Sequence, residues 1–366
     1  MRLCNNSIFY LHKFPQNYGN FKHFQSFPLK ERSANQKVVY VCIYFKITMA
    51  RIGSDIQKSK KILAASGLVS IPTETVYGLA ANAFDIAAVL KIFATKNRPT
   101  FDPLIVHAAS LDKIESFTKN IPNKAFALAE NFWPGPLTLL LERTSLIPDM
   151  VTSGLPKVAV RIPKHPLTLN LLSQLDFPLA APSANPFGYI SPTTAKHVND
   201  QLGNKISYIL DGGDCAIGIE STIIGFEGED AIVYRLGGLS INAIEELIGT
   251  VQVVPHSTSQ PQSPGQLKSH YAPKKKIVIG NIADMITQYK NEEIGILSFQ
   301  KQYPKIAQAN QIQLSSLEDI NEAAKNLFTA LRKLDALSVT IILAEFVPNI
   351  GLGLAINDRL KRASSK

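Results

Sequence analysis

The stretch DIQKSKKILAASGLVSIP, residues 55–72, decides the fold because its hydrophobic period changes within a few residues. Its first part spaces apolar residues as a helix does and ends at Gly67, and LVSIP then reads as a short buried strand. The same change between helical and strand periodicity recurs along the chain. PLIVHA (103–108) and KVAVRIP (157–163) are strand-like, and they alternate with helical segments such as FDIAAVLKIFATK (84–96). Many strands with interleaved helices predict an α/β layered domain with a mixed sheet.

A linker-like segment interrupts this alternation. Residues 254–276 are rich in Pro, Ser, Gln and Lys, which is typical of a linker, and they end the domain predicted for residues 49–253. Residues 277–366 follow a β-α-β-α-β-α order, which predicts a small Rossmann-like parallel sheet. A Ser315…Glu318 capping box is expected to begin its long helix. The GxGxxG fingerprint is absent from this part, so no dinucleotide is assigned to it.

The basic charge of the chain is concentrated at its N-terminal end. The formal net charge is +9, but residues 1–48 hold seven Lys/Arg and one acid, which leaves 31 basic and 28 acidic residues elsewhere. The charge therefore says little about nucleic-acid binding by the rest of the chain. Residues 1–48 lack helical or strand periodicity, and Met49 begins a sequence that reads as a domain start. We expect this leader to be disordered or mis-assigned, with an organelle-targeting peptide as the alternative.

The cysteines and the apolar runs indicate a compartment. Cys4, Cys42 and Cys215 form no CxxC pair, which makes disulfides and a cysteine zinc site unexpected and favours the cytoplasm. Apolar runs stay below the roughly 18 residues that a membrane helix requires. Cys215 is interpreted as an inert thiol, because no base is identifiable beside it.

Polar side chains gather where the predicted strands end. Thr73 with its neighbours in IPTETVYGLAANA (71–83) reads either as a helix N-cap or as part of an anion site at a helix N-terminus. Lys96 and Arg98 are either cations favoured at a helix C-terminus or a phosphate clamp on a proline-stiffened loop. His107, at the end of its strand, is either a core histidine or a ligand.

Three further segments add the same kinds of groups. Arg161 interrupts an apolar strand and must find a partner or a ligand, because an unpaired buried charge is prohibitive. APSANPFG (181–188) holds Ser183 and Asn185 between two prolines, and Arg235 ends a later strand. The sequence contains no P-loop, GxSxG or HExxH motif. The combination favours gripping a phosphorylated, hydroxylated small molecule by position and charge, without a covalent nucleophile.

Taken in order, these motifs closely resemble the threonylcarbamoyl-AMP synthase family with its YrdC-like domain. The resemblance covers residues 54–250 continuously, and SPGQLKSHYAP (263–273) with GLGLAINDRLKRAS (351–364) matches the long, two-domain form. Its motifs in the first domain are PTETVYGLA, KNRPTFDPLIVH, FWPGPLTLLL, VAVRIP, APSANPFGYISPT, DGG with GIESTI, and YRLGG. The set is very specific because the order of the motifs is kept.

The resemblance implies an open twisted sheet with a deep basic cavity and a defined reaction. L-threonine, bicarbonate and ATP with Mg²⁺ would give threonylcarbamoyl-AMP and pyrophosphate, and partner enzymes would move the threonylcarbamoyl group onto tRNA beside the anticodon. Direct tRNA binding is left open. The residues that would hold ATP are Lys96, Arg98, Thr100, Ser183, Asn185, Ser191, Arg235 and Tyr271, with Lys96 and Arg98 also catalytic and Tyr271 acting as a lid. The residues that would surround threonine are Thr73, His107, Arg161, Ala181 and Ser221.

The chain departs from the family pattern at two positions near these motifs. Asp102 stands where the family usually has Asn, and Lys157 stands where a small hydroxyl residue is common. Asp102 would weaken phosphate binding, and Lys157 would add a phosphate contact. Two rival functions share the fold, a double-stranded RNA-binding module and a carbamoyltransferase of hydrogenase maturation. The near-neutral charge outside residues 1–48 counts against the first, and the lack of CxxC zinc motifs counts against the second.

Overall fold

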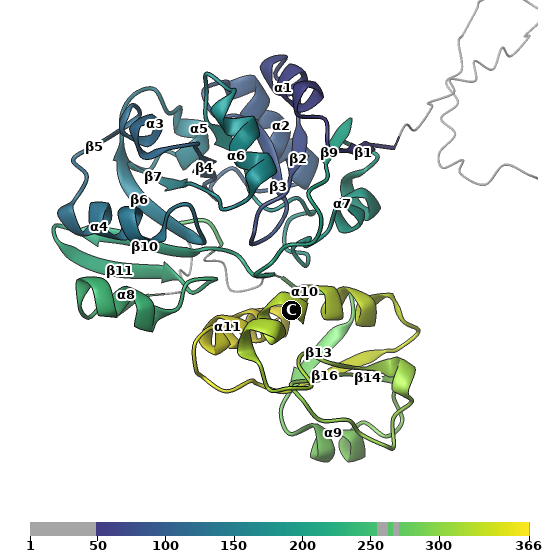
Figure 1. Ribbon diagram of the computed structural model, residues 1–366. Coiled ribbons are helices and arrows are strands. Elements are labelled where there is room, and N and C mark those ends of the chain that lie inside the picture. Colours follow the sequence, from purple (N-terminus) through teal and green to yellow (C-terminus); the bar gives the residue numbers. More distant parts are fainter. Residues whose placement is uncertain (1–48, 255–262, 266–270, 366) are drawn as a thin grey trace, which may run out of the picture. The chain divides into compact units, whose positions relative to one another are not determined.

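The computed structural model describes residues 49–254, 263–265 and 271–365, and it builds two sheets from them (Figure 1). The larger sheet has the strand order β1-β9-β2-β3-β8-β4-β7-β6-β10-β11-β12, and β5 pairs with β6. Its strands are β1 (Arg51–Gly53), β2 (Val69–Ile71), β3 (Gly78–Asn82), β4 (Ile105–His107), β5 (Thr118–Lys119), β6 (Leu137–Arg143), β7 (Lys157–Arg161), β8 (Leu179–Ala180), β9 (Tyr208–Leu210), β10 (Thr222–Glu227), β11 (Asp230–Arg235) and β12 (Gln252–Val253). Strand β7 runs parallel to β4 and antiparallel to β6, which confirms the predicted mixed sheet.

Helices connect these strands and begin where the sequence supplies a cap. They are α1 (Ile56–Ala64), α2 (Ile86–Lys96), α3 (Leu111–Glu115), α4 (Asn123–Phe132), α5 (Asp149–Thr152), α6 (Pro166–Ser173), α7 (Ala195–Leu202) and α8 (Ile241–Ile248). The Asp55 carboxylate accepts a hydrogen bond from the Lys58 amide at 2.9 Å, and Asp85 does the same for the first amides of α2. An acidic side chain at this position satisfies amides that have no partner inside the helix.

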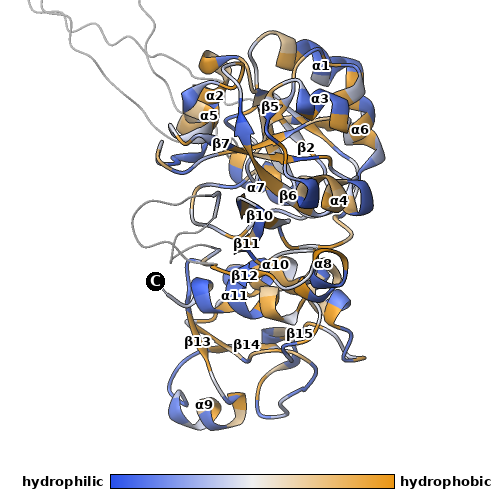
Figure 2. Ribbon diagram, turned by 90° about the vertical axis from the view of Figure 1, so that its left-hand side faces the viewer, coloured by the Kyte–Doolittle hydropathy of each residue, from blue (hydrophilic) through white to orange (hydrophobic). Residues whose placement is uncertain are grey.

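Strand β3 shows how the sheet buries both of its faces. Leu79 and Ala81 belong to the apolar cluster that includes Ile92 of α2, whereas Ala80 belongs to the cluster that includes Leu63 of α1. Successive side chains of a strand point to opposite faces, so helices must cover both sides. Figure 2 shows the result, with apolar residues along the strands and polar residues on the outer sides of the helices.

The second sheet is small and wholly parallel, as predicted for this part of the chain. Its order is β13-β16-β14-β15. Its elements are β13 (Lys276–Ile279), α9 (Ile282–Gln288), β14 (Ile294–Ser298), the 3₁₀ turn η1 (Gln308–Asn310), β15 (Gln311–Gln313), α10 (Ile320–Ala336), β16 (Ile341–Ala344) and α11 (Gly353–Ala363). The prediction missed β15 because its sequence, QIQ, offers no apolar run to identify a strand.

The start of α10 corrects the expected capping box. Asp319, and not Ser315, is the N-cap residue, and its carboxylate accepts a hydrogen bond from the Glu322 amide. Ser315 lies one turn earlier, where its hydroxyl oxygen accepts from the Asp319 amide at 2.9 Å. Glu318 has a φ of 60° and stands before the cap, so it cannot be the third residue of the helix. The expectation was wrong because SSLED offers two candidate caps and the acid nearer the apolar repeat takes the position.

The two sheets belong to one compact unit, and side chains of α10 join them. The Tyr189 hydroxyl donates to the Asp335 carboxylate at 2.6 Å, and Arg332 donates to the Ile190 carbonyl oxygen. The domain boundaries given above stay a prediction; residues 1–48 and most of the linker lie outside the described residues. Among the helices that the structure describes, none is long and apolar enough to cross a membrane.

Candidate functional site

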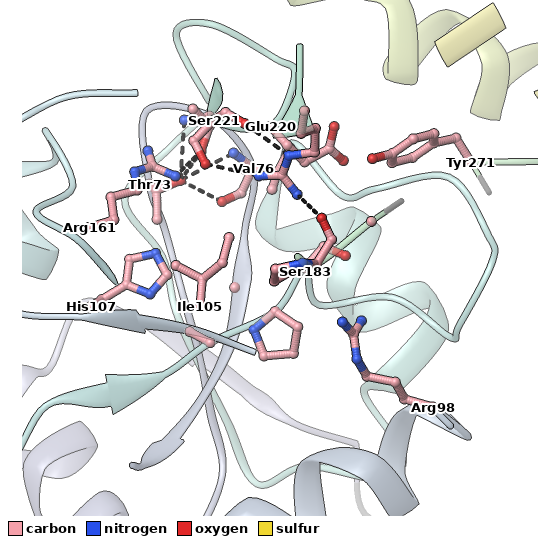
Figure 3. A pocket seen from close by; sticks show the side chains of 17 residues that line it. Thr73, Val76, Arg98, Ile105, His107, Arg161, Ser183, Glu220, Ser221 and Tyr271 are labelled. Carbon is pink, nitrogen blue, oxygen red and sulfur yellow. Dashed lines mark hydrogen bonds between the residues drawn. The ribbon is translucent and has the colours of Figure 1, made fainter. Parts of the chain in front are cut away.

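One pocket collects most of the residues that the sequence singled out, and it lies where several strands of the large sheet end (Figure 3). Its empty volume is about 570 Å³, which includes space open to solvent. In Figure 3, Arg161, His107 and Thr73 lie on one side of it and Arg98 and Tyr271 on the other. The lining residues are Thr73, Thr75, Val76, Gly78, Arg98, Ile105, His107, Arg161, Ala181, Pro182, Ser183, Glu220, Ser221, Arg235, Pro264, Gly265 and Tyr271.

The segment after β2 forms a turn and leads directly into β3. The Thr73 hydroxyl oxygen accepts from the Val76 amide at 3.1 Å and donates to the Val76 carbonyl oxygen at 2.6 Å. Hydrogen bonds between a side chain and a nearby backbone give the chain an alternative to the first turn of a helix. The expectation of a helix start at Thr73 is therefore wrong. Gly78 is the first residue of β3, and the chain at Ala181 approaches it closely. A Cβ added at Gly78 would lie only 3.2 Å from the Ala181 Cβ, which favours glycine at this position.

Arg161 on β7 finds the partner that its burial requires. Its guanidinium lies 2.7 Å from the Glu74 carboxylate and also donates to the Thr75 hydroxyl at 2.9 Å and to the Gly135 carbonyl oxygen at 3.1 Å. The second oxygen of Glu74 accepts from the Lys164 amide at 2.9 Å. Glu74 was not predicted as a site residue, although an acid that follows a buried strand is a signal that the sequence contains.

His107 lies beside Arg161 and is neutral at physiological pH. Burial, followed by the charge of Arg161, lowers the pKa of His107 to about 3. Its Nδ1 has no hydrogen-bond partner among the residues that the structure describes. The ring lines the pocket, and its Nδ1 is itself buried, so a role of His107 as a ligand residue stays a prediction.

Arg235 and Ser221 form a second buried group at the end of β11. The Arg235 Nε donates to the Ser221 carbonyl oxygen and another of its nitrogens donates to the Ser221 hydroxyl oxygen, both at 2.9 Å. Burial lowers the pKa of Arg235 to about 10, so the side chain stays charged at neutral pH. Among the described residues, no carboxylate lies within ion-pair distance of it. Its charge is thus available to an anionic ligand.

Arg98 lines the opposite side of the pocket and forms an ion pair with the buried Asp102. One Asp102 carboxylate oxygen lies 3.0 Å from the guanidinium, which also donates to the Pro103 carbonyl oxygen at 2.7 Å. Burial raises the pKa of Asp102, although Arg98 acts in the opposite direction. Asp102 therefore compensates part of the Arg98 charge. The other departure, Lys157, lies outside the pocket lining and donates to the Phe226 carbonyl oxygen.

Four predicted site residues lie outside the pocket lining. Lys96 is buried, and its ammonium donates to the Ser183 and Asn185 carbonyl oxygens, both at 2.5 Å. The Asn185 side chain donates to the Pro186 and Tyr189 carbonyl oxygens at 2.9 and 2.8 Å. These bonds brace the loop that presents Ser183 to the pocket. The other two are Ser191, which donates to Glu220 at 2.5 Å, and Thr100, which is exposed.

The described part of the linker contributes to the pocket wall. Pro264, Gly265 and Tyr271 line it, and residues 266–270 lie outside the described residues. Tyr271 has a φ of 65°, an uncommon conformation for a residue with a side chain. Its ring stacks on Phe328 of α10, with 5.6 Å between the centroids. The Tyr271 side chain therefore joins the pocket to the second sheet.

Two chemical features concern nucleophiles and metals. Burial raises the pKa of the Cys215 thiol above its ordinary value, which agrees with an inert thiol. Within the described ranges, no three His, Cys, Asp or Glu side chains come together as a metal-binding group.

Comparisons with known proteins agree on one family. The family described as telomere recombination matches residues 61–237, and the threonylcarbamoyl-AMP synthase C-terminal domain matches residues 239–365. The chain is 42% identical over 307 residues to the threonylcarbamoyl-AMP synthase of Pyrococcus abyssi, covering 81% of this chain and 90% of the relative. It is 38% identical over 320 residues to that of Bacillus subtilis, covering 84% of this chain and 92% of the relative.

A solved structure extends the likeness to three dimensions. The crystal structure of P. abyssi Sua5 complexed with L-threonine matches with a TM-score of 0.80 and 38% identity, over 86% of this chain and 97% of that one. The similarity thus covers both sheets and nearly the whole length of the relatives. The chain belongs to the threonylcarbamoyl-AMP synthase family.

Proposed function

We propose that the pocket binds L-threonine, bicarbonate and ATP and joins them into threonylcarbamoyl-AMP with release of pyrophosphate. The observation that carries this proposal is the convergence on one pocket of Arg98 from the loop after α2, Arg161 from β7 and Arg235 from β11. Three buried guanidinium groups suit a substrate set with a carboxylate, a carbamate and a chain of phosphates, because arginine matches the geometry of these anions.

Threonine occupies the side of the pocket that Arg161 and His107 form. Three of the five Arg161 N–H donors hold Gly135, Thr75 and Glu74, which leaves two for the threonine carboxylate. Thr73, Ser221, neutral His107 and the backbone at Ala181 provide further donors and acceptors around it. The solved relative in complex with L-threonine supports this assignment, since that protein shares the fold over both sheets.

The nucleotide occupies the side of the pocket that Arg98, Ser183, Arg235 and Tyr271 line. Lys96 and Asn185 support it by holding the loop after β8, and their direct contact with ATP, like that of Ser191 and Thr100, remains a prediction. Tyr271 covers the nucleotide as a lid. Mg²⁺ would arrive with the phosphates, held mainly by phosphate oxygens and water, as this ion commonly is in nucleotide sites. Glu220 is the acidic residue among those that line the pocket.

The reaction needs position and charge compensation more than a covalent intermediate. The threonine nitrogen adds to the carbon of bicarbonate, one C–OH bond breaks, and that hydroxide leaves as water with a proton from the nitrogen, which gives a carbamate. A carbamate oxygen then attacks the α-phosphorus of ATP, the bond to the bridging oxygen breaks, and pyrophosphate leaves with the electron pair. Arg98 and Arg235 offset the negative charge that grows on the phosphates during this step.

The product is a mixed anhydride that must be passed on quickly. Enzymes that transfer the threonylcarbamoyl group to the tRNA adenosine beside the anticodon are its expected consumers. The cytoplasm is proposed as the compartment on the basis of cysteine usage alone.

ATP–pyrophosphate exchange tests this function. We expect exchange only when threonine and bicarbonate are both present, and we expect Lys96→Ala combined with Arg98→Ala to abolish it. Absence of exchange with well-folded protein would contradict the proposal, and so would undiminished exchange in the double variant. Tight binding of double-stranded RNA without exchange would instead favour the RNA-binding alternative, and carbamoyl-phosphate-dependent exchange would favour the carbamoyltransferase.

A further inference from the structure

Glu220 is an acid on the wall of a pocket whose proposed ligands are anions. It precedes β10, is 6% exposed and lines the pocket next to Ser221. A free carboxylate at this place would repel phosphates and compete with them for the nearby Arg235. Both of its oxygens are held from outside the pocket lining, because Ser191 donates to Oε1 at 2.5 Å and Arg359 donates to Oε2 at 3.2 Å.

Arg359 comes from α11, which follows β16, the last strand of the second sheet in the sequence. It is the largest side chain among those fully buried in the described residues, with 0% exposure. Besides Glu220, its guanidinium pairs with the Asp358 carboxylate at 3.0 Å and donates to the carbonyl oxygen of Leu236, the residue after Arg235, at 2.6 Å. Burial of a cation has a large desolvation cost, which must be offset by ion pairs and hydrogen bonds with the groups around it.

The same guanidinium also contacts the proposed lid. It lies 5.2 Å from the centroid of the Tyr271 ring, whose position is further fixed by Phe328 and by Arg362 at 4.7 Å. A cation over an aromatic face is attracted to it, more strongly when both are removed from water. Arg359 thus contacts a pocket acid, the backbone beside a pocket arginine and a pocket aromatic ring.

We propose that Arg359 is a positioning residue for the nucleotide site. It neutralises Glu220 and holds it away from Arg235, so that the Arg235 charge is available to the phosphates. The second sheet therefore contributes to the reaction through charge compensation as well as through the linker that it anchors. This inference deepens the proposed function and rests on it for the identity of the ligand.

The test compares binding of ATP with Mg²⁺ by calorimetric titration in the full-length protein and its variants. Arg359→Met removes the charge but keeps most of the volume, and it should weaken ATP binding by about tenfold or more while threonine binding changes much less. Arg359→Lys keeps a charge and should restore most of the affinity. Lys361→Ala, an exposed position of the same helix, is the matched control and should bind ATP as the wild type does.

The double variant Glu220→Gln with Arg359→Met decides between charge compensation and simple damage to the fold. With a neutral residue 220, nothing competes for Arg235, so ATP binding should return toward the wild-type value. The proposal is overturned if Arg359→Met binds ATP like the wild type, if it weakens both ligands equally, or if the double variant binds no better. Should Arg359→Met fail to fold, Arg359→Lys and the double variant still decide. A wild-type protein that binds ATP without exchange would contradict the proposed reaction alone.

Discussion

The Glu74 carboxylate lies 2.7 Å from the Arg161 guanidinium, and both side chains are buried in the wall of the pocket. The two residues are 87 positions apart in the chain and meet because β7 ends next to the turn that follows β2. The pair solves the problem of a charged residue in an apolar strand. It also fixes the plane of the guanidinium and directs its remaining donors.

Removal of this acid should destabilise the fold. Glu74→Gln leaves the Arg161 charge buried without its partner, and we expect the free energy of unfolding to fall by roughly 3–5 kcal/mol. Urea denaturation measures this change, and Glu115→Gln, at an exposed position, serves as the control. An unfolding free energy equal to that of the wild type would show that the pair does not stabilise the protein.

Arg98 should contribute to ATP use far more than to threonine use. Loss of one charged hydrogen-bonding group to a phosphate corresponds to a rise in the ATP KM of about tenfold to a hundredfold. Because Arg98→Ala alone would strand Asp102, the variant is best made together with Asp102→Asn. Steady-state kinetics of product formation give both KM values, with Lys61→Ala on α1 as the control. Equal changes in both KM values would remove Arg98 from the nucleotide side.

Asn185 should act mainly on the loop that carries Ser183. Its amide donates to two carbonyl oxygens of its own loop, and Asn185→Ala leaves both without that donor. We expect the unfolding free energy to fall by about 1–3 kcal/mol and the ATP KM to rise less than with the Arg98 variant. If the ATP KM rises steeply while stability is unchanged, Asn185 contacts the nucleotide directly.

His107 should make the fold sensitive to acid. Its pKa is about 3 in the folded protein because of burial, against about 6.5 in an unfolded chain, so the unfolded state binds a proton first as the pH falls. Stability conferred by neutral His107 is therefore complete above pH ~6.5 and decreases by up to ~1.4 kcal/mol per pH unit toward pH ~3.

Denaturation curves of the wild type and His107→Gln between neutral and acidic pH measure this contribution. The variant should lose less stability over that range. The pKa of His197 is also lowered by burial, to about 4, but this residue is present in both proteins and does not affect their difference. Parallel stability curves would mean that His107 takes up its proton equally in both states.

Much of the fold could be predicted because local signals agree with the long-range structure. The Asp85 cap, the apolar period of α2 and the runs that form β4 and β7 each specify their element without reference to distant residues. The short strand β15 has no such signal, since its polar sequence becomes a strand only by pairing with β14. The start of α10 needed a choice between neighbouring caps that composition alone does not decide.

The site was predictable where a residue is unusual in its own segment, and Arg161 is the clearest case. Which polar residues face the pocket and which brace its loops depends on side-chain direction. Lys96 was expected at the ligand, yet its ammonium is bound to backbone carbonyl oxygens. Glu220 and Arg359 were not assigned roles because the roles depend on the contact between them. The two residues are 139 positions apart in the sequence, so their own segments do not indicate this contact.

The central claim is that this pocket makes threonylcarbamoyl-AMP, and isotope tracing tests it most directly. The purified protein is incubated with L-threonine, Mg·ATP and ¹³C-bicarbonate, and the product is identified by mass spectrometry. We predict a threonylcarbamoyl-adenylate that carries the label in its carbamoyl carbon, in an amount that falls sharply when Arg235→Met replaces the wild type. A folded, ATP-binding wild-type protein that yields no labelled adenylate, or an Arg235→Met variant that yields as much, would contradict the claim.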